Sequence, residues 1–189
     1  MKRFFMMFSQ MHYVSLIGSL IIKNPSRFPM LYTYHYYSQI GTIEIKEENE
    51  HITGVCLLTE KEEVAKREFQ SPETPLLHQA HHQLTEYFAG ERTQFDLPIA
   101  YPHGTPFQHA VWNALRDIPY GETRSYEDIA RAIGKPKAVR AIGQANTRNP
   151  LLLLVPCHRV INKNGTIGGF GCGVEVKRKL IQLEGIEFK

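Results

Sequence analysis

A cysteine and a histidine stand side by side at Cys157 and His158, directly after an apolar run and a proline. The run, residues 151–155, predicts a short buried strand. Pro156 would end that strand, because proline has no backbone donor. A thiol held beside an imidazole can act as a nucleophile when its surroundings lower the thiol pKa. The alternative is a small buried side chain without chemistry, which is what most free cysteines are.

The cysteines and histidines do not predict a metal site. Three cysteines are spread over 189 residues without a CxxC pair, and such a sparse, odd set is typical of reduced thiols in a cytosolic protein. A zinc site would need closely spaced ligands. Three clustered histidines fall on a predicted helix, where we expect a solvated or partly packed face. These residues are Cys56, Cys157, Cys172, His78, His81 and His82.

The segment before Cys157 predicts two short helices joined by a tight connection. Ser125 and Asp128 have the spacing of a capping box, which would start the first helix. The second helix is predicted over about 136–147, after the connection 134–136. Helices joined in this way form a helix-turn-helix, whose second helix lies against a DNA groove. An ordinary αα-hairpin with solvated lysines is the alternative on the pattern alone.

Charge favours the DNA-binding interpretation of these two helices. Residues 124–148 contain six basic and two acidic side chains, an excess larger than the net charge of +3 for the whole chain. A net charge of +3 does not by itself imply a nucleic-acid partner. Neutralisation of phosphates, however, supplies most non-specific affinity for DNA. Lys137 and Arg140 would lie in the first half of the second helix.

The first half of the chain predicts a small sheet and one long helix. Aromatic residues and alternating apolar residues are typical of short strands in a meander. A four-residue apolar repeat predicts an amphipathic helix that follows them. The expected strands are 32–37, 41–47, 51–58 and 95–99, and the expected helix is 76–88. A last amphipathic helix is predicted near the C-terminus, over 176–183.

The length of the chain allows one domain, or two small ones that share a core. We place a boundary in the linker 101–104, so that a subdomain over 30–103 precedes one over 104–189. Residues 1–29 contain an apolar stretch that is too short for a membrane span, with no recognisable cleavage site. We therefore expect 1–29 to be a disordered extension or the product of an upstream start, and we expect no membrane association.

Several motifs together resemble those of the methylated-DNA–protein-cysteine methyltransferases, also called O6-alkylguanine-DNA alkyltransferases. The motifs are PCHRVI at 156–161, GTPFQHAVWNALRDIPYGETRSY at 104–126, GKPKAVRAIGQANTRNP at 134–150 and LEG at 183–185. The resemblance is dense over 104–185, looser over 30–101, and absent from 1–29. It implies an α+β fold in which a small α/β, ribonuclease H-like subdomain precedes a mainly helical domain with a winged helix-turn-helix.

The resemblance implies catalytic roles for four residues. Cys157 would be the acceptor nucleophile, and His158 would act through a water molecule as its base. Glu184 would orient the histidine, so that the relay is similar in logic to a protease triad. Asn149 would brace the turn that joins the helix-turn-helix to the active-site segment.

The resemblance also implies which residues contact DNA. Arg140 would enter the duplex where the damaged base leaves, Tyr126 would help to rotate the nucleotide out, and Lys137 would lie with Arg140 on the DNA-binding helix. The substrate pocket would be formed by Tyr126, Val160, Phe170, Gly171 and Cys172.

The implied reaction is repair of DNA by direct reversal. The damaged base would be flipped into the pocket, and Cys157 would take the methyl or alkyl group from O6-methylguanine, and less efficiently from O4-methylthymine. The product, S-methylcysteine, is a thioether, so one turnover would inactivate the protein irreversibly. The partner would be double-stranded DNA that carries O6-alkylguanine or O4-alkylthymine. We expect a cytoplasmic monomer with no metal and no organic cofactor.

One position departs from the family pattern. Cys172, in the loop GGFGCG at 168–173, stands where relatives usually have a small residue, often glycine, so pocket width and substrate preference depend on it. We expect a tolerated small side chain there and not a second acceptor. Three other functions are the alternatives: a DNA-binding sensor without transfer, a Cys-His hydrolase, and a winged-helix regulator. Alkylation of Cys157 by damaged DNA separates the transferase from all three.

Overall fold

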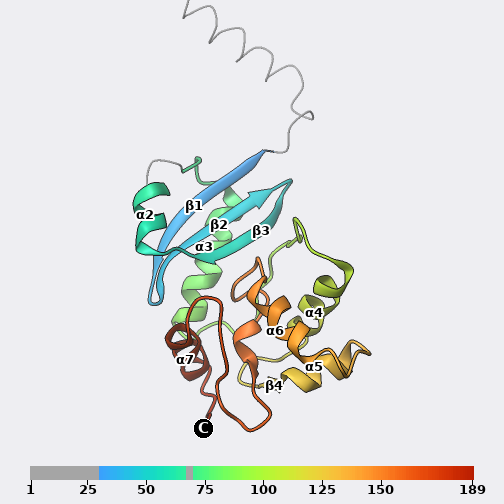
Figure 1. Ribbon diagram of the computed structural model, residues 1–189. Helices are drawn as coiled ribbons and strands as arrows, with labels where there is room; N and C mark the ends of the chain where they lie inside the picture. The colour runs from blue at the N-terminus through green and yellow to red at the C-terminus, as the bar shows by residue number, and fades with distance from the viewer. Residues whose placement is uncertain (1–29, 67–69) are drawn as a thin grey trace, which may run out of the picture. The chain divides into compact units, whose positions relative to one another are not determined.

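Three antiparallel strands form the sheet of the N-terminal part (Figure 1). The computed structural model describes residues 30–66 and 70–189, and the extension predicted over 1–29 lies outside the described residues. The strands β1 (Leu31–Ser38), β2 (Gly41–Glu48) and β3 (His51–Leu57) are neighbours in that order, which confirms the three strands predicted for this segment. Two-residue turns join them. At the second turn both residues have positive φ, as in the hairpin turns that match strand twist.

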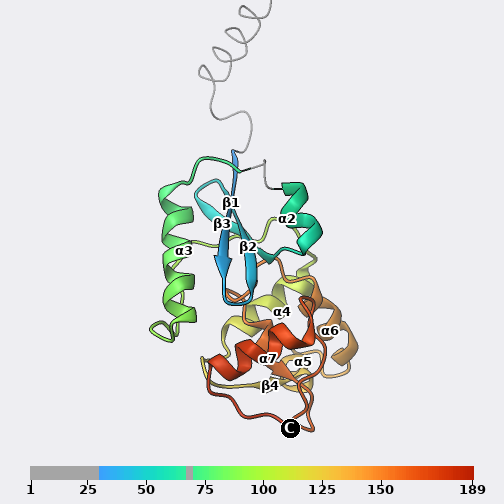
Figure 2. The same cartoon turned by 90° about the vertical axis from the view of Figure 1, so that its left-hand side faces the viewer.

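One helix lies on each side of this sheet (Figure 2). The long helix α3 (Pro75–Phe88) is capped by the hydroxyl of Thr74, starts with a proline, and buries its apolar side chains in the core, as predicted. The short helix α2 (Glu60–Lys66) has no buried residue. An ion pair ties α2 to the sheet, because the ammonium of Lys66 lies 3.2 Å from the buried carboxylate of Glu44.

The prediction of a strand over 95–99 is wrong, because this segment forms a single bridge and not a strand. Ile99 bridges Ile52 of β3 in parallel. The N–H of Ile52 donates to the carbonyl of Pro98 at 2.8 Å, and Ala100 donates to the carbonyl of Ile52 at 3.1 Å. Pro98 itself has no N–H to give, so this short contact does not extend into a ladder.

Helices and two very short strands make up the C-terminal part. Capping boxes begin the first two helices, at Thr105 and at Ser125, and the one at Ser125 confirms the start that the sequence predicted for the helix-turn-helix. The indole N–H of Trp112 donates to the carbonyl of Ala145 at 2.9 Å and joins the first helix to the third. The elements are α4 (Pro106–Arg116), β4 (Arg124–Ser125), α5 (Tyr126–Ala132), α6 (Val139–Thr147), the 3-10 turn η2 (Cys157–Arg159), β5 (Val160–Ile161) and α7 (Val174–Leu183).

The second helix of the predicted helix-turn-helix begins later than expected, at Val139. The residue before a proline is disfavoured in the helical conformation, so Lys135 and Pro136 form a turn. The N–H of Ala138 closes that turn on the carbonyl of Lys135 at 2.9 Å. Lys137 therefore lies in the turn before α6, and the prediction that it belongs to the helix is wrong.

The apolar run before the cysteine is a buried loop and not the predicted strand. Leu151 bridges Val55 at the edge of β3, but Leu153 has a φ of 70, which is uncommon for a branched side chain. The side chain of Asn149 closes the loop, since it accepts from the N–H of Leu151 at 3.0 Å and donates to the carbonyl of Val155 at 2.8 Å. The apolar residues correctly predicted that the segment is buried, whereas the polar side chain of Asn149 determines the path of its backbone.

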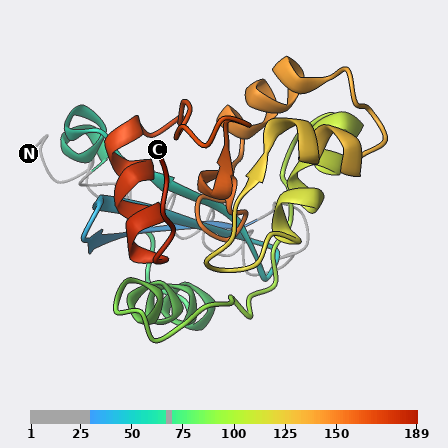
Figure 3. The same cartoon turned by 90° about the horizontal axis from the view of Figure 1, so that it is seen from below.

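The loop and η2 lie between α7 on one side and α5 and α6 on the other (Figure 3). Helix α7 ends with Glu184 as its C-cap, and Gly185 follows with a φ of 70, a left-handed conformation that glycine adopts easily. Residues Leu31–Lys189 form one compact unit. A small sheet with its helices followed by a helical part confirms the predicted α+β class.

Candidate active site

Cys157 is the first residue of η2 and its side chain is almost completely enclosed, with 6% of its surface exposed. Burial raises the pKa of the thiol to about 11, and the hydrogen bond from Nδ2 of Asn149, at 3.3 Å from Sγ, opposes this rise. The resting thiol is therefore neutral at pH 7. A reaction at this sulfur requires a nearby base and a positive charge that stabilises the thiolate.

His158 and Glu184 lie in contact, as predicted, and both are buried. Nε2 of His158 is 2.7 Å from Oε1 of Glu184. Because a carboxylate only accepts hydrogen bonds, Nε2 carries the proton and Nδ1 keeps a free lone pair. Nδ1 has no hydrogen-bond partner among the described residues. Burial lowers the pKa of His158 although Glu184 opposes this, so the imidazole is neutral and able to accept a proton.

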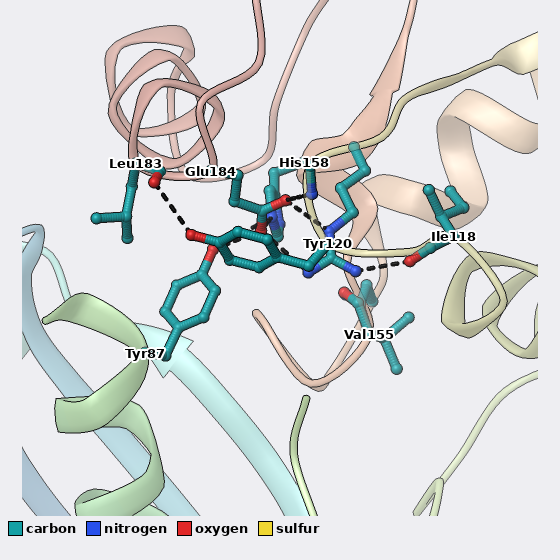
Figure 4. A network of polar contacts seen from close by, with 10 residues as sticks. Tyr87, Ile118, Tyr120, Val155, His158, Leu183 and Glu184 are labelled. Atoms are coloured by element: carbon teal, nitrogen blue, oxygen red, sulfur yellow. Dashed lines mark hydrogen bonds and ion pairs between the residues drawn. The ribbon is translucent and has the colours of Figure 1, made fainter. Parts of the chain in front are cut away.

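The carboxylate of Glu184 is held by donors from several elements (Figure 4). Arg159 donates to both carboxylate oxygens, at 2.9 and 3.0 Å. The hydroxyl of Tyr87 donates to Oε1 at 2.7 Å, and the N–H of Gly121 donates to Oε2 at 3.2 Å. Burial favours the neutral acid, but the hydrogen bonds from His158 and Arg159 outweigh it and bring the pKa of Glu184 down to about 2. Glu184 is thus a permanent anion behind the histidine.

Lys177 is a buried cation near the cysteine. Its side chain is 0% exposed, and its ammonium donates to the carbonyls of Val160 at 2.5 Å and Gly169 at 3.3 Å. Burial lowers the pKa of Lys177 to about 8, and the nearby Cys157 acts in the opposite direction. A positive charge here favours the thiolate of Cys157 over the thiol.

Three buried side chains of the site were missed by reasoning from the sequence: Tyr87, Arg159 and Lys177. Two of them carry a signal that a closer inspection could have used. Arg159 is a charged residue inside an apolar run, and Lys177 falls on the apolar stripe of the last helix. A buried charge needs a partner, so both predict an interior polar network. Tyr87 carries no such signal, because its pairing with Glu184 depends on the tertiary fold.

Tyr126 is the first residue of α5 and lies close to the buried cluster. Burial raises the pKa of its hydroxyl, and Cys157 adds to the effect. The ammonium of Lys177 is 6.0 Å from the centre of its ring. Gly168 has a φ of 70, and a Cβ there would lie 3.2 Å from the hydroxyl of Tyr126. The loop 168–173 therefore passes directly beside Tyr126.

The other predicted pocket residues lie around the same loop and the strand that precedes it. Val160 is fully buried in β5. Phe170 and Cys172 are half-buried and pack against the core, and a Cβ on Gly171 would lie 3.5 Å from the carbonyl of Thr147 at the end of α6. Burial raises the pKa of the Cys172 thiol, and this thiol contributes to the raised pKa of Cys157.

Two predicted DNA-binding residues lie outside the buried cluster. Arg140 is exposed in the first turn of α6, and Lys137 is exposed in the turn before it. The structure therefore separates the predicted site residues into a buried group around Cys157 and an exposed basic group on the helix-turn-helix.

The part of the chain that the structure describes contains no set of three or more His, Cys, Asp or Glu side chains placed to hold a metal ion. The clustered histidines are engaged separately: His78 lies 3.3 Å from Glu73, and His82 lies 3.3 Å from Glu86. Within the same described residues, the helices are all too short or too polar to cross a membrane.

Two family models match the chain. The ribonuclease-like domain of 6-O-methylguanine DNA methyltransferase matches residues 30–101, and the DNA binding domain of the same family matches residues 106–186. Together they cover most of the chain. The second model includes every residue for which the sequence predicted a catalytic or DNA-contacting role.

Individual proteins are similar over much of the chain. The constitutive methylated-DNA–protein-cysteine methyltransferase of Bacillus subtilis (strain 168) is 52% identical, over 79% of this chain and 93% of that protein. The crystal structure of the Mycobacterium tuberculosis O6-methylguanine methyltransferase matches with a TM-score of 0.73 and 42% identity, over 82% of this chain and 93% of that chain. The Mycobacterium tuberculosis OGT in complex with DNA matches with a TM-score of 0.71 and 43% identity, over 79% and 90% of the two chains.

Proposed function

The chain belongs to the 6-O-methylguanine DNA methyltransferase family, and from this premise we propose that it repairs DNA by moving an alkyl group onto its own Cys157. Family membership makes the chain a methylated-DNA–protein-cysteine methyltransferase with DNA as its partner. The finer proposal concerns the substrate and the stoichiometry. O6-methylguanine is the main substrate and O4-methylthymine a poorer one, and the S-methylcysteine that forms ends the activity after one turnover.

The free lone pair on Nδ1 of His158 is the observation that supports this proposal most strongly. His158 follows Cys157 in η2, and Glu184 accepts the proton of the other ring nitrogen at 2.7 Å. The histidine is therefore neutral, oriented, and has one nitrogen available as a base. Asn149 braces the turn that presents the thiol, because it bonds both the loop and Sγ.

The proposed transfer step starts with a proton that passes from Sγ of Cys157 to Nδ1 of His158 through a bridging water. Glu184 remains ionised and stabilises the imidazolium, and the ammonium of Lys177 stabilises the thiolate. The thiolate attacks the methyl carbon, and the S–C bond forms while the C–O6 bond breaks. The electron pair of that bond goes to the guanine. The imidazolium of His158 then gives up its proton through water and the guanine gains one at N1, so the thiol proton ends on the released base and the histidine is neutral again.

The exposure of only 6% at Cys157 supports base flipping. An atom inside a base stack cannot reach a sulfur that is enclosed in protein, so the damaged nucleotide has to leave the duplex. We place α6 against a groove of the DNA, with Lys137 on the phosphates and Arg140 entering the stack. Tyr126, at the start of the first helix of the helix-turn-helix and beside the buried cluster, would assist the rotation of the nucleotide.

The flipped base would lie against the residues beside the loop 168–173. Tyr126 and Val160 would form one wall, and Phe170, Gly171 and Cys172 the other, with Cys172 as a tolerated small side chain. We further propose that the protein acts as a monomer in the cytoplasm, without a metal or organic cofactor. We also propose that the chain is divided into an N-terminal subdomain over 30–103 and a catalytic, DNA-binding subdomain over 104–189.

Stoichiometric transfer of labelled methyl tests this function. The protein is mixed with excess duplex that carries one tritium-methylated O6-methylguanine, and protein-bound label is counted over time. We expect one methyl per protein molecule and no further uptake, and no uptake by Cys157→Ser. Cys56→Ser is the matched control, since it removes a free thiol in β3, and it should transfer like the parent chain.

Two results would contradict the proposal. Binding of the damaged duplex without any transfer would make the chain a sensor of lesions, and release of methyl from many duplexes per protein would make it a turning-over enzyme.

A further inference from the structure

Tyr87 connects the N-terminal part of the chain to the candidate relay. It lies in the last turn of α3 and is 0% exposed. Its hydroxyl donates to Oε1 of Glu184 at 2.7 Å and lies 3.5 Å from Nε2 of His158. Figure 4 shows the Tyr87 side chain directed from α3 towards this carboxylate. A residue outside the matched DNA binding domain thus contacts the residue that orients the histidine.

We propose that Tyr87 is a positioning residue for the transfer reaction, whose hydroxyl holds Oε1 of Glu184 so that the carboxylate aligns His158 and leaves it uncharged. The inference rests on the function proposed above, because it assumes that His158 is the base for Cys157. It goes beyond that function because it makes the N-terminal part a contributor to the chemistry.

The distribution of donors over the carboxylate supports a specific role for this hydroxyl. Oε2 is held by the N–H of Gly121 and by Nε of Arg159. Oε1, the oxygen that faces the histidine, accepts hydrogen bonds from Nε2 of His158, Nη2 of Arg159 and the hydroxyl of Tyr87. Tyr87 is therefore the neutral donor that shares one oxygen atom with the histidine.

Sharing an oxygen has a consequence for the charge of His158. A hydroxyl that donates to Oε1 takes up part of the negative charge that would otherwise stabilise the imidazolium. Glu184 favours the imidazolium, whereas Arg159 and Lys177 disfavour it, and burial acts with these two cations. Cys157 lies next to the histidine in η2, and the Tyr120 ring packs edge-on against Tyr87. Removal of the Tyr87 hydroxyl shifts this balance towards the charged ring.

The variant Tyr87→Phe removes the hydroxyl and keeps the buried ring. We expect single-turnover transfer from an O6-methylguanine duplex to be slower by about tenfold, because an orienting hydrogen bond to the relay is lost. We also expect the acid limb of the rate, which reports protonation of His158, to move to higher pH. A purely structural role would lower the thermal midpoint without moving this limb.

Tyr36→Phe is the matched control for this experiment. Tyr36 also donates its hydroxyl to a glutamate at 2.7 Å, to Glu73, on the sheet of the N-terminal part. The control removes the same kind of bond away from the relay, and it should keep the parent rate and the parent pH profile even if its thermal midpoint falls.

A double-variant comparison shows whether Tyr87 acts through Glu184. In a Glu184→Gln background, Tyr87→Phe should cause little further loss of rate, because the group on which it acts has been changed. The inference is overturned if Tyr87→Phe keeps the parent rate and acid limb while the parent chain transfers methyl normally. It is also overturned if Tyr36→Phe reproduces both effects. Failure of the parent chain itself to transfer methyl would instead refute the proposed function.

Discussion

Burial sets the ionisation of the groups around Cys157. The thiol is neutral because burial raises its pKa to about 11, whereas Lys177 is still mostly charged at pH 7 although burial lowers its pKa to about 8. Glu184 remains charged because His158 and Arg159 bond it in spite of its burial. The site therefore keeps its nucleophile unreactive at rest and surrounds it with a base and a cation that favour the thiolate.

The variant Lys177→Met tests the role of the buried cation. Methionine has a similar length but no charge, so the thiolate loses its nearby positive partner and we expect transfer to slow by about tenfold or more. In the parent chain the rate should also fall as pH rises through about 8, where the ammonium loses its proton. The measurement is the single-turnover rate from pH 6 to 9.5.

Lys179→Met is the control for this variant, because Lys179 is exposed on the same helix, and it should behave like the parent chain. An unchanged rate in Lys177→Met, with the same alkaline limb, would show that the buried ammonium only supports the loop.

At the residue scale, the sequence predicted the members of the site that belong to a local motif. Cys157 and His158 are neighbours in the chain, and Asn149 and Glu184 followed from the family resemblance. The contact between Tyr87 and Glu184 joins residues that are 97 positions apart. No period or spacing reports such a contact, because it depends on how α3 packs against the end of α7.

At the scale of elements, the helix-turn-helix and the loop before Cys157 are built differently. Side-chain caps at Ser125 and Asp128 and the turn at Pro136 define α5 and the start of α6. The loop before Cys157 instead depends on Asn149, whose side chain bonds two of its backbone groups. Since Asn149 directly follows the last turn of α6, the basic helices and the thiol are joined by one short, internally bonded segment.

The variant Lys137→Ala tests the basic element directly. If Lys137 neutralises one phosphate, its loss lowers the magnitude of the slope of log affinity against log salt concentration by about 1. The loss should also weaken binding to damaged and undamaged duplexes by the same factor. The affinity of a fluorescent duplex, titrated over a range of salt concentrations, provides this slope. Lys179→Ala on α7 should leave the slope unchanged, and an unchanged slope in Lys137→Ala would exclude a phosphate contact at this position.

Local signals explain which elements were predicted correctly. A capping box acts within four residues, so α5 begins directly after Ser125, where the sequence predicted. The apolar run 151–155 has the composition of a strand, but its backbone turns at Leu153. That turn is set by the side chain of Asn149, which bonds backbone groups of the loop, and by the bridge from Leu151 to Val55, a tertiary contact that the composition of the run does not report.

At the scale of the whole unit, Glu184 joins three separate parts of the chain. Its carboxylate is bonded by Tyr87 in α3, by Gly121 after α4, and by His158 and Arg159 in η2. The same anion therefore orients the candidate base and holds the N-terminal and C-terminal parts together. Loss of its charge should affect stability as well as transfer.

Acid unfolding tests this structural role of Glu184. The pKa of a glutamate in an unfolded chain is about 4.3, whereas in the folded chain Glu184 has a pKa of about 2. A depressed pKa contributes stability that is complete above the unfolded value and is lost as pH falls towards the folded value. The free energy of unfolding, measured with urea between pH 6 and 2.5, should therefore fall with pH less steeply in Glu184→Gln than in the parent chain. Equal steepness would contradict the role assigned to this carboxylate.

The central claim is that Cys157 accepts the alkyl group, and peptide mass spectrometry tests it most directly. The full-length protein is incubated with a duplex that carries one O6-methylguanine, digested, and analysed for the mass of one added methyl group on each cysteine-containing peptide. We predict that the methyl group is found on Cys157 alone, and that Cys157→Ala carries none on any cysteine. A methyl group on Cys172 would contradict the assignment of the acceptor, and an unmodified protein bound to intact O6-methylguanine would contradict the transfer reaction itself.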